Sequence, residues 1–301
     1  MNTKINFAGI EFKNPVMTAS GTFGSGIEFS EFVDLNKLGG VVTKGVAITP
    51  WAGNPTPRVA ETYGGMLNAI GLQNPGLDTF LSRDIPFLEK YDTNIIVNVC
   101  GHSEEEYVSA VERLAEAESI KMLEINISCP NVKEGGIAFG TNPVMVEKIT
   151  AAIKKVAKQP IVMKVSPNVT DITETAKAAE AGGADGISLI NTLTGMKIDI
   201  NRRTFALANK TGGLSGPAIK PVAVRMVYQC ANAVKIPIIG MGGIASAEDA
   251  LEFIMAGASL VSVGTANFHD PLTTIKVIDG IEDYMDASGI EKLSELIGCV
   301  K

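Results

Sequence analysis

The amino-acid sequence predicts a (β/α)8 TIM barrel, in which eight parallel strands lie inside a ring of helices. Three observations predict it: eight short apolar runs, amphipathic segments between them, and a length of 301 residues with 46% hydrophobic side chains. Alternating strands and helices are typical of parallel α/β folds, and eight such units at this length favour a closed barrel. A doubly wound open sheet is the alternative that the same pattern allows.

The predicted strands are runs rich in apolar and β-branched side chains. Such runs are typical of parallel strands that are buried on both faces. They span residues 14–20, 39–46, 95–100, 122–128, 161–166, 186–191, 236–241 and 260–265.

The predicted helices are the amphipathic segments between these runs. The segment 103–118 begins with a capping box, in which Ser103 is followed three residues later by Glu106. The other helical segments span residues 142–157, 169–182, 217–234, 246–258 and 271–286.

Three segments lie outside the minimal barrel. Residues 3–12 alternate between apolar and polar side chains, which predicts an N-terminal β-hairpin that closes the bottom of the barrel. Residues 47–75 and 192–214 are long loops after strands 2 and 6, and long loops in a compact domain are usually functional. Because barrel active sites lie at the carboxyl ends of the strands, both loops are expected beside the site. No linker or repeat interrupts the pattern, so we expect one domain over residues 1–301.

Composition argues against several classes of protein. The net charge is −7, so the chain lacks the overall excess of Lys and Arg that is typical of a nucleic-acid-binding protein. No apolar run reaches the ~20 residues of a membrane span, and residues 1–8 lack a signal-peptide core, so we expect a cytoplasmic protein. The four cysteines form no C-x-x-C pair, and the two histidines, His102 and His269, are interpreted as loop or surface residues. We therefore expect no metal centre in this chain.

The carboxyl ends of the predicted strands are unusually polar. Five asparagines and two lysines gather there, and a buried amide or ammonium group is costly unless it has a partner. We interpret the cluster as the site of a planar polar ligand rather than as internal packing.

Glycine-rich ends of the last two strands predict a phosphate site. Residues 240–243 read GMGG and are followed one strand later by Gly264 and Thr265. Bare backbone N–H groups at such positions suit an anion, although glycine also simply permits tight turns. Residues 240–245 match the dinucleotide fingerprint G-x-G-x-x-A, but the acidic residue expected ~20 positions later is missing. A nicotinamide dinucleotide is therefore not expected here.

Cys129 is the single residue that points most directly to chemistry. It follows the fourth predicted strand and lies between Asn126 and Asn131. A free thiol has a pKa of about 8.5, which suits a general base or a nucleophile. A small buried hydrophobic side chain is the alternative, and it is the interpretation for the other three cysteines.

Taken together, these motifs resemble those of the class 1 dihydroorotate dehydrogenases, which are flavoproteins of pyrimidine biosynthesis. The resemblance covers nearly the whole chain and rests on the order and spacing of its pieces. They are TASGTFG (18–24), TKGV (43–46), GNPTPRVAETYGGMLNAIGLQNPG (53–76), NISCPN (126–131), MKVSPN (163–168), NTL (191–193), GGLSGPAIKP (212–221), GMGGI (240–244) and VGTAN (263–267).

Two details of the resemblance indicate the subclass. Membrane-attached class 2 enzymes have an N-terminal helical extension and a serine base, whereas this chain has Cys129 and no extension. Residues 58–76 and 134–143 resemble the 1B type. This type pairs an FMN-containing catalytic subunit with an electron-transfer subunit that carries FAD and a 2Fe–2S cluster and passes electrons to NAD. The resemblance also implies a homodimeric core of a heterotetramer.

The resemblance implies a role for each matching residue. Cys129 would be the general base that removes the C5 proton of (S)-dihydroorotate, while hydride passes to FMN and orotate forms. FMN would be held by Ser20, Lys44, Gly45, Asn98, Asn126, Lys164, Ile190, Gly216, Gly242, Gly243, Gly264 and Thr265. Substrate would be held by Lys44, Asn68, Ala69, Ile70, Gly71, Leu72, Asn126, Asn131, Asn191 and Thr192. Trp51 has no assigned role.

Other functions stay open at this point. A class 1A enzyme would share the fold and the FMN site but would reduce fumarate. A lyase would use Lys164 as a Schiff-base amine on the same barrel. A non-catalytic scaffold would have no need for Cys, Lys and Asn together at the strand ends.

Overall fold

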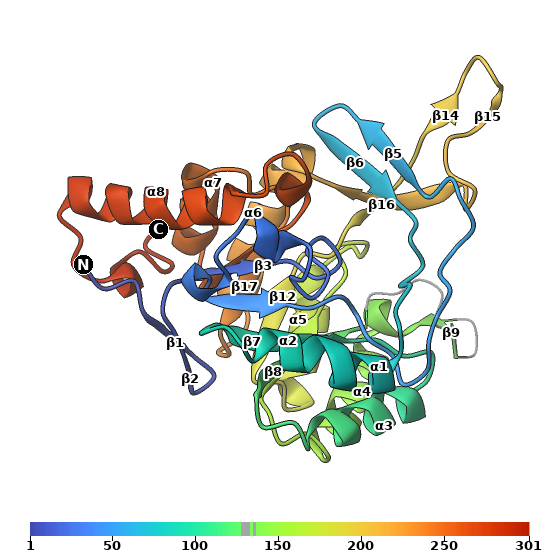
Figure 1. Ribbon diagram of the computed structural model, residues 1–301, viewed down its shortest axis with the longest axis horizontal. Helices are drawn as coiled ribbons and strands as arrows, with labels where there is room; N and C mark the ends of the chain where they lie inside the picture. The colour runs from blue at the N-terminus through green and yellow to red at the C-terminus, as the bar shows by residue number, and fades with distance from the viewer. Residues whose placement is uncertain (128–132, 135–136, 301) are drawn as a thin grey trace.

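The computed structural model describes residues 1–127, 133–134 and 137–300. Its centre is a closed barrel of parallel strands in the order β11-β12-β17-β18-β3-β4-β7-β8, which confirms the predicted fold class (Figure 1). The barrel strands are β3 (Val16–Thr18), β4 (Gly40–Val42), β7 (Asn94–Val99), β8 (Ile120–Asn126), β11 (Ile161–Lys164), β12 (Gly186–Leu189), β17 (Ile238–Met241) and β18 (Leu260–Val263).

The barrel strands are buried almost throughout, which is why each reads as an apolar run. Their register sets the depth of the polar side chains near the carboxyl ends. Asn98 on β7 lies opposite Glu124 on β8, and Lys164 on β11 lies opposite Asn126 on β8. Since successive inward-facing positions on a strand are two residues apart, Glu124 lies one layer deeper in the barrel than Asn126.

In the described part of the chain, six helices of nine or more residues surround the barrel, at the places where the sequence predicts helices. They are α3 (Glu104–Leu114), α4 (Pro143–Lys154), α5 (Ile172–Ala181), α6 (Lys220–Ala231), α7 (Ala247–Met255) and α8 (Thr273–Ser288). Shorter turns are α1 (Leu77–Thr79), the π-helical η3 (Phe80–Asp84), α2 (Ile85–Leu88), and the 3-10 turns η4 (Phe139–Thr141), η5 (Pro217–Ile219), η6 (Thr265–Phe268) and η7 (Leu293–Glu295).

At the starts of α3, α4, α5 and α7, a side chain accepts a hydrogen bond from a backbone N–H group that the first turn leaves unpaired. Ser103 accepts from the Glu106 N–H at 3.3 Å, as predicted. The reciprocal bond differs from a standard capping box, because the Glu106 carboxylate accepts from the His102 N–H at 2.7 Å. Helix α7 has the complete box, formed by Ser246 and Asp249.

The first βα unit departs from the predicted pattern. Between β3 and β4 the described chain forms only two 3-10 turns, η1 (Phe29–Glu31) and η2 (Leu35–Lys37). Gly24 and Gly26 adopt positive φ angles of 58° and 83°, which an α-helix does not tolerate. The Phe23 and Phe29 rings stack with their centroids 4.2 Å apart, and both pack in or against the hydrophobic core.

The N-terminal hairpin closes the base of the barrel, as predicted. It consists of β1 (Ile5–Phe7) and β2 (Ile10–Phe12), whose phenylalanines are fully buried. A Cβ atom on Gly186, the first residue of β12, would lie 2.7 Å from the Phe7 ring. The ring therefore fills the space that this glycine leaves.

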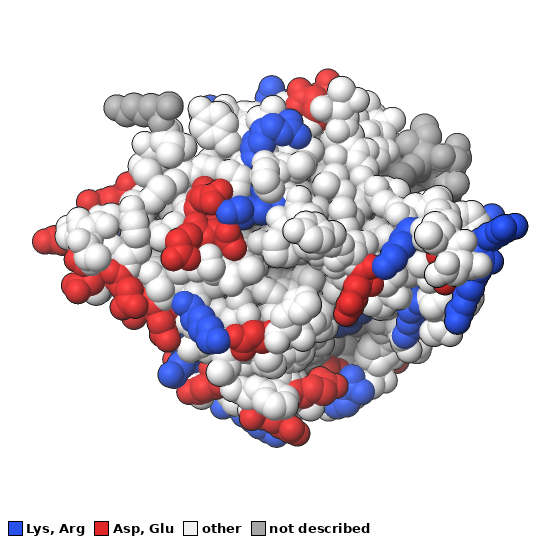
Figure 2. Space-filling model, turned by 90° about the horizontal axis from the view of Figure 1, so that it is seen from above, with Lys and Arg blue, Asp and Glu red and all other residues white. Residues whose placement is uncertain are grey.

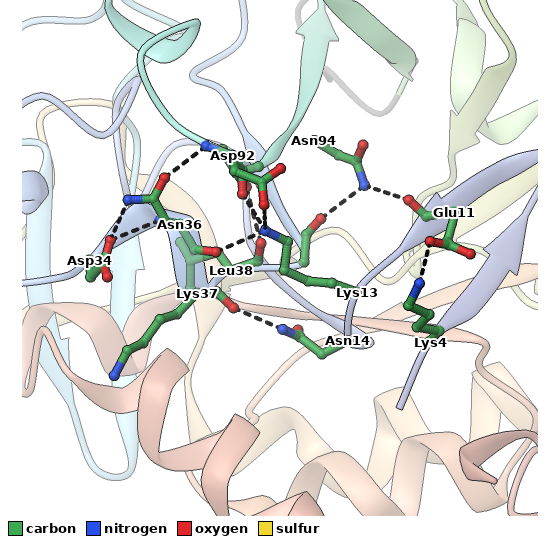
Figure 3. Close-up of polar contacts among 12 residues, drawn as sticks. Lys4, Glu11, Lys13, Asn14, Asp34, Asn36, Lys37, Leu38, Asp92 and Asn94 are labelled. Carbon is green, nitrogen blue, oxygen red and sulfur yellow. Dashed lines mark hydrogen bonds and ion pairs between the residues drawn. The ribbon is translucent and has the colours of Figure 1, made fainter. Parts of the chain in front are cut away.

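Polar contacts anchor the hairpin to the neighbouring loops (Figure 3). Lys13 lies 2.6 Å from the Asp92 carboxylate and donates to the Asn36 carbonyl at 2.9 Å. Asn94 donates from its amide to the Glu11 carbonyl at 3.0 Å. These contacts fix the end of the hairpin against the loops that precede β4 and β7.

The two long loops are not irregular but form one sheet above the barrel. The loop after β4 contains β5 (Val59–Thr62) and β6 (Gly65–Asn68), and the loop after β12 contains β13 (Leu193–Met196) and β16 (Thr211–Ser215). These strands pair antiparallel in the order β13-β16-β6-β5, so the two loops hold each other. A projecting arm, β14 (Ile198–Asp199) with β15 (Thr204–Phe205), extends from the sheet (Figure 1). Residues Lys133–Glu134 (β9) and Ile137–Ala138 (β10) form a further short pair.

Within the described ranges, no helix is long and apolar enough to cross a membrane. On the face that Figure 2 shows, Asp and Glu side chains lie interspersed with Lys and Arg side chains.

We expect the Phe7→Ala variant to lose about 3–5 kcal/mol of the free energy of unfolding, because a buried ring is replaced by a cavity at the barrel base. Urea denaturation followed by circular dichroism measures this loss. Glu11→Gln, on the exposed face of the same hairpin, is the matched control and should change stability by less than about 1 kcal/mol. Equal stability of the two variants would show that the hairpin does not support the barrel.

Candidate active site

The polar strand ends converge on one cavity of about 260 Å³ at the carboxyl face of the barrel. All twelve residues that the sequence assigns to the cofactor line it, although they come from segments spread over most of the chain. They are Ser20, Lys44, Gly45, Asn98, Asn126, Lys164, Ile190, Gly216, Gly242, Gly243, Gly264 and Thr265.

A second cavity of about 300 Å³ adjoins the first. The two share seven of the residues assigned to substrate: Lys44, Asn68, Ile70, Leu72, Asn126, Asn191 and Thr192. Ala69 and Gly71 line the second cavity. The structure therefore brings together the described residues of both predicted sets.

Polar contacts fix the amides between the two cavities. Asn191 donates to the Asn126 side-chain oxygen at 3.2 Å, and the Tyr107 hydroxyl donates to the Asn126 carbonyl at 2.7 Å. Thr192 lies where a Cβ atom on Gly213 would be, so only glycine is tolerated in β16 at this point. The loop sheet thereby places Thr192 beside the barrel.

The floor of the first cavity is a buried polar cluster. The Lys164 ammonium donates to the Ser20 hydroxyl at 3.1 Å and lies 3.7 Å from a carboxylate oxygen of Glu124. The same oxygen accepts from the Asn98 amide at 2.6 Å. The other amide atom, Asn98 Oδ1, has no partner among the described residues and neither has the buried hydroxyl of Ser262. These atoms suit a polar ligand, because unpaired buried polar atoms are costly.

The glycine-rich strand ends form a backbone cradle. Gly216, Gly242 and Gly243 adopt positive φ angles of 106°, 125° and 89°. A Cβ atom on Gly243 would lie 2.8 Å from the Gly216 carbonyl oxygen. Among the described residues, no acceptor bonds the backbone N–H groups of Gly243 and Gly264. Bare N–H groups of this kind bind anions.

Lys44 is the second ammonium group of the cavity. Burial lowers the pKa of Lys44 below its ordinary value of 10.5; Cys100 opposes this shift, and the positive charges of Lys164 and Arg58 add to it. An ammonium ion in this setting gains from an anionic ligand, which replaces the solvent that burial removes.

The three described cysteines differ in exposure. Cys100 and Cys230 are buried and Cys299 is exposed. Burial raises the pKa of the Cys230 thiol to about 12, which makes it inert at neutral pH. Cys129 and Asn131 lie outside the described residues. The described chain ends at Ile127, directly after β8, and resumes at Lys133.

The two histidines are exposed and do not line either cavity. The His102 ring stacks on Trp51 with 3.8 Å between the ring centroids, and its Nδ1 atom lies 3.3 Å from the Glu106 carboxylate. Trp51, which had no assigned role, thus packs against the loop after β7. Within the described chain, no group of three or more His, Cys, Asp or Glu side chains is placed to hold a metal ion.

Sequence reasoning missed two features of the site. Glu124 is the carboxylate beneath the cavity, and the signal for it was a charged residue inside an apolar strand, two positions before Asn126. Val59, Met66 and Phe268 add apolar side chains to the cavity lining. No local motif marks these three, because the loop sheet and the turn after β18 bring them together.

Comparison with known proteins gives consistent matches. A family model described as dihydroorotate dehydrogenase matches residues 2–285. The chain is 69% identical over 301 residues to a Lachnoclostridium phytofermentans protein named dihydroorotate dehydrogenase B (NAD(+)), catalytic subunit, with 100% of both chains covered. A protein of the same name from Alkaliphilus metalliredigens is 65% identical over 298 residues, which are 99% of this chain and 98% of the relative.

The fold also matches a solved structure. The crystal structure of DHODH from Eimeria tenella in complex with ferulenol matches this chain with a TM-score of 0.81. The match covers 99% of this chain and 88% of that chain. The sequence identity is 24%, so this likeness concerns the fold.

Replacing Lys44 by methionine should stabilise the ligand-free protein near neutral pH, because a desolvated charge is removed. The pKa of Lys44 is lowered by folding, so the unfolded chain binds more protons between that lowered pKa and 10.5. The contribution of Lys44 to the free energy of unfolding of the wild type therefore rises with pH through this interval. The extra stability of the Lys44→Met variant should accordingly become smaller as the pH approaches 10.5. Urea denaturation at several pH values measures the difference.

Lys177→Met, on the exposed face of α5, is the control and should show no such pH-dependent difference. A Lys44→Met protein that is less stable than the wild type at neutral pH would contradict the prediction.

Proposed function

This chain belongs to the dihydroorotate dehydrogenase family, and we propose that it is the FMN-dependent catalytic subunit of the NAD-linked type. It oxidises (S)-dihydroorotate to orotate in pyrimidine biosynthesis. The observation that carries the proposal is the identity of 69% over the full length of a relative with that name. The convergence of the predicted cofactor and substrate residues on two adjoining cavities supports it.

The residues of the first cavity fit FMN. The bare N–H groups of Gly243 and Gly264 suit its phosphate, with Gly216, Gly242 and Thr265 completing the cradle. The unpaired Asn98 Oδ1 and the two ammonium groups suit the polar edge of a flavin ring. Bound FMN supplies a hydride acceptor. In this proposal Ser20, Gly45, Asn126 and Ile190 complete the pocket for the ring and the ribityl chain.

The second cavity suits dihydroorotate. Amide side chains can donate and accept, so Asn68, Asn126 and Asn191 match the ring carbonyls and N–H groups of the substrate. The Lys44 ammonium neutralises its carboxylate. The remaining contacts in the proposal come from Ala69, Ile70, Gly71, Leu72, Asn131 and Thr192.

Cys129 is the general base of the proposed reaction. In the sequence it lies three positions after Asn126, the last residue of β8, and Asn126 lines both cavities. Its thiolate takes the proton from C5 of the substrate, and this loss of a proton accompanies departure of hydride from C6. The protein thus orients the substrate and removes a proton, and FMN held by the residues of the first cavity would supply the acceptor for the hydride.

The electrons then pass to a partner. The relatives are named catalytic subunits, which implies a separate electron-transfer subunit for them, and we extend that arrangement to this chain. We propose FAD and a 2Fe–2S cluster on the partner, NAD as the final acceptor, a homodimeric core within a heterotetramer, and a cytoplasmic location.

The two alternative functions have less support. A class 1A enzyme would reduce fumarate, but the relatives are named for NAD(+). A Schiff-base lyase would need a Lys164 amine that is free to attack a carbonyl, whereas Lys164 Nζ donates to the Ser20 hydroxyl at 3.1 Å and lies 3.7 Å from the Glu124 carboxylate.

The Cys129→Ala variant should keep its flavin but reduce it roughly 10²–10⁴-fold more slowly with dihydroorotate, because the general base is lost. Stopped-flow absorbance measures this half-reaction. In the wild type the rate should rise with pH toward the thiol pKa of about 8.5. Cys230→Ala removes an inert buried thiol and serves as control, with an unchanged rate. A Cys129→Ala variant that reduces its flavin as fast as the wild type would exclude the assigned base.

The isolated chain should oxidise dihydroorotate with a dye acceptor but not with NAD, because the electron path to NAD needs the partner subunit. Absorbance assays with each acceptor test this. Rapid NAD reduction by the chain alone would refute the division between subunits, and efficient use of fumarate would instead indicate the class 1A reaction.

A further inference from the structure

Glu124 is a buried carboxylate that the proposed reaction does not use. It is 1% exposed and lies near the middle of the barrel wall, on a strand whose other residues are mostly apolar. Burial of a carboxylate is unfavourable unless charges and hydrogen bonds compensate it. The contacts of Glu124 therefore indicate what the charge does there.

One oxygen of Glu124 joins two residues of the cavity floor. Asn98 donates from Nδ2 to Glu124 Oε2 at 2.6 Å, and Lys164 Nζ lies 3.7 Å from the same oxygen. Asn98 and Lys164 are 1% and 5% exposed, so bulk water does not screen the cluster. The three residues come from the adjacent strands β7, β8 and β11, whose pairing fixes their relative heights.

The hydrogen bond with Glu124 fixes which way the Asn98 amide points. Nδ2 donates to the Glu124 carboxylate, so Oδ1 is the amide atom that remains available to a ligand. It has no hydrogen-bond partner among the described residues. A Cβ atom on Gly45 would lie 2.7 Å from Oδ1, so this glycine keeps the space in front of the acceptor open. Asn98 is thereby set to accept a hydrogen bond from a ligand.

The charge of Glu124 also changes the field that Lys164 presents. Lys164 is tethered on one side by Ser20 and faces the carboxylate on another. Lys44 is the other cation of this cavity and shares its lining with Lys164. Without Glu124, two ammonium groups would act on a ligand with no nearby anion among the residues of this floor.

Building on the proposed function, we propose that Glu124 is a positioning residue of the FMN site. It orients the Asn98 amide and holds the Lys164 ammonium, and it offsets part of the positive charge presented to the flavin. A reduced flavin carries negative charge that a neighbouring cation stabilises. The carboxylate therefore lowers the reduction potential of the flavin and favours the onward transfer of electrons.

The test is the reduction potential of bound FMN in Glu124→Gln, measured by equilibration with a reference dye. Glutamine keeps an acceptor for Asn98 but removes the charge, so the equilibrium with the dye should shift about tenfold toward reduced flavin. That shift equals ~30 mV for a two-electron couple. Asp84→Asn removes another buried carboxylate, which pairs with Arg83 and does not line either cavity, and should leave the potential unchanged.

Each outcome decides the question. A Glu124→Gln protein that holds FMN at the wild-type potential overturns this proposal and leaves the proposed function intact. A wild-type protein that binds no FMN overturns the proposed function itself. If Glu124→Gln does not fold, the double variant with Lys164→Gln must restore folding, because an unpaired buried ammonium is then the cause. A double variant that also fails to fold overturns the proposal.

Discussion

Burial of charge inside an apolar barrel is the constraint on which the rest of the site depends. The strands are packed on both faces, so a charged side chain among them needs a partner from a neighbouring strand. Lys164 and Glu124 meet this need for each other, with Asn98 and Ser20 completing the hydrogen bonds. The cluster can exist only because the parallel register places its members at matching heights. The register of the barrel strands therefore determines which charged and polar side chains of the site can pair.

Much of the barrel could be predicted from the sequence because its strands are buried on both faces. Each then appears as a largely apolar run, and most of the runs end in polar residues or glycine at the face where the cavities lie. The twelve residues that the resemblance assigns to the cofactor line one cavity, mainly because position at a strand end fixes position in space. The N-terminal hairpin was predictable from its alternation, which reflects one buried and one exposed face.

What could not be predicted arises from contacts between distant segments. Residues 59–68 and 193–215 lack strong strand signals because the sheet that they form is only partly buried and contains several glycines. Each loop gains its strand structure by pairing with the other. No helix was predicted from the sequence between the first two strands, and the described chain has only two 3-10 turns there, with Gly24 and Gly26 at positive φ angles that a sequence does not reveal. Glu124 was overlooked because a single charge in an apolar run gives no clue to its partner. The role assigned to Cys129 still rests on the sequence resemblance.

The sheet built from two loops has a consequence for how such a site can change over evolution or by design. Asn68 lies opposite Gly213 across the β6–β16 ladder, and Gly213 makes room for Thr192. One loop thus supplies the template on which the other is ordered. A loop transplanted alone from another barrel would bring side chains for a new ligand but would lose its hydrogen-bonding counterpart. A change of ligand preference in this architecture should therefore require that both loops be exchanged together.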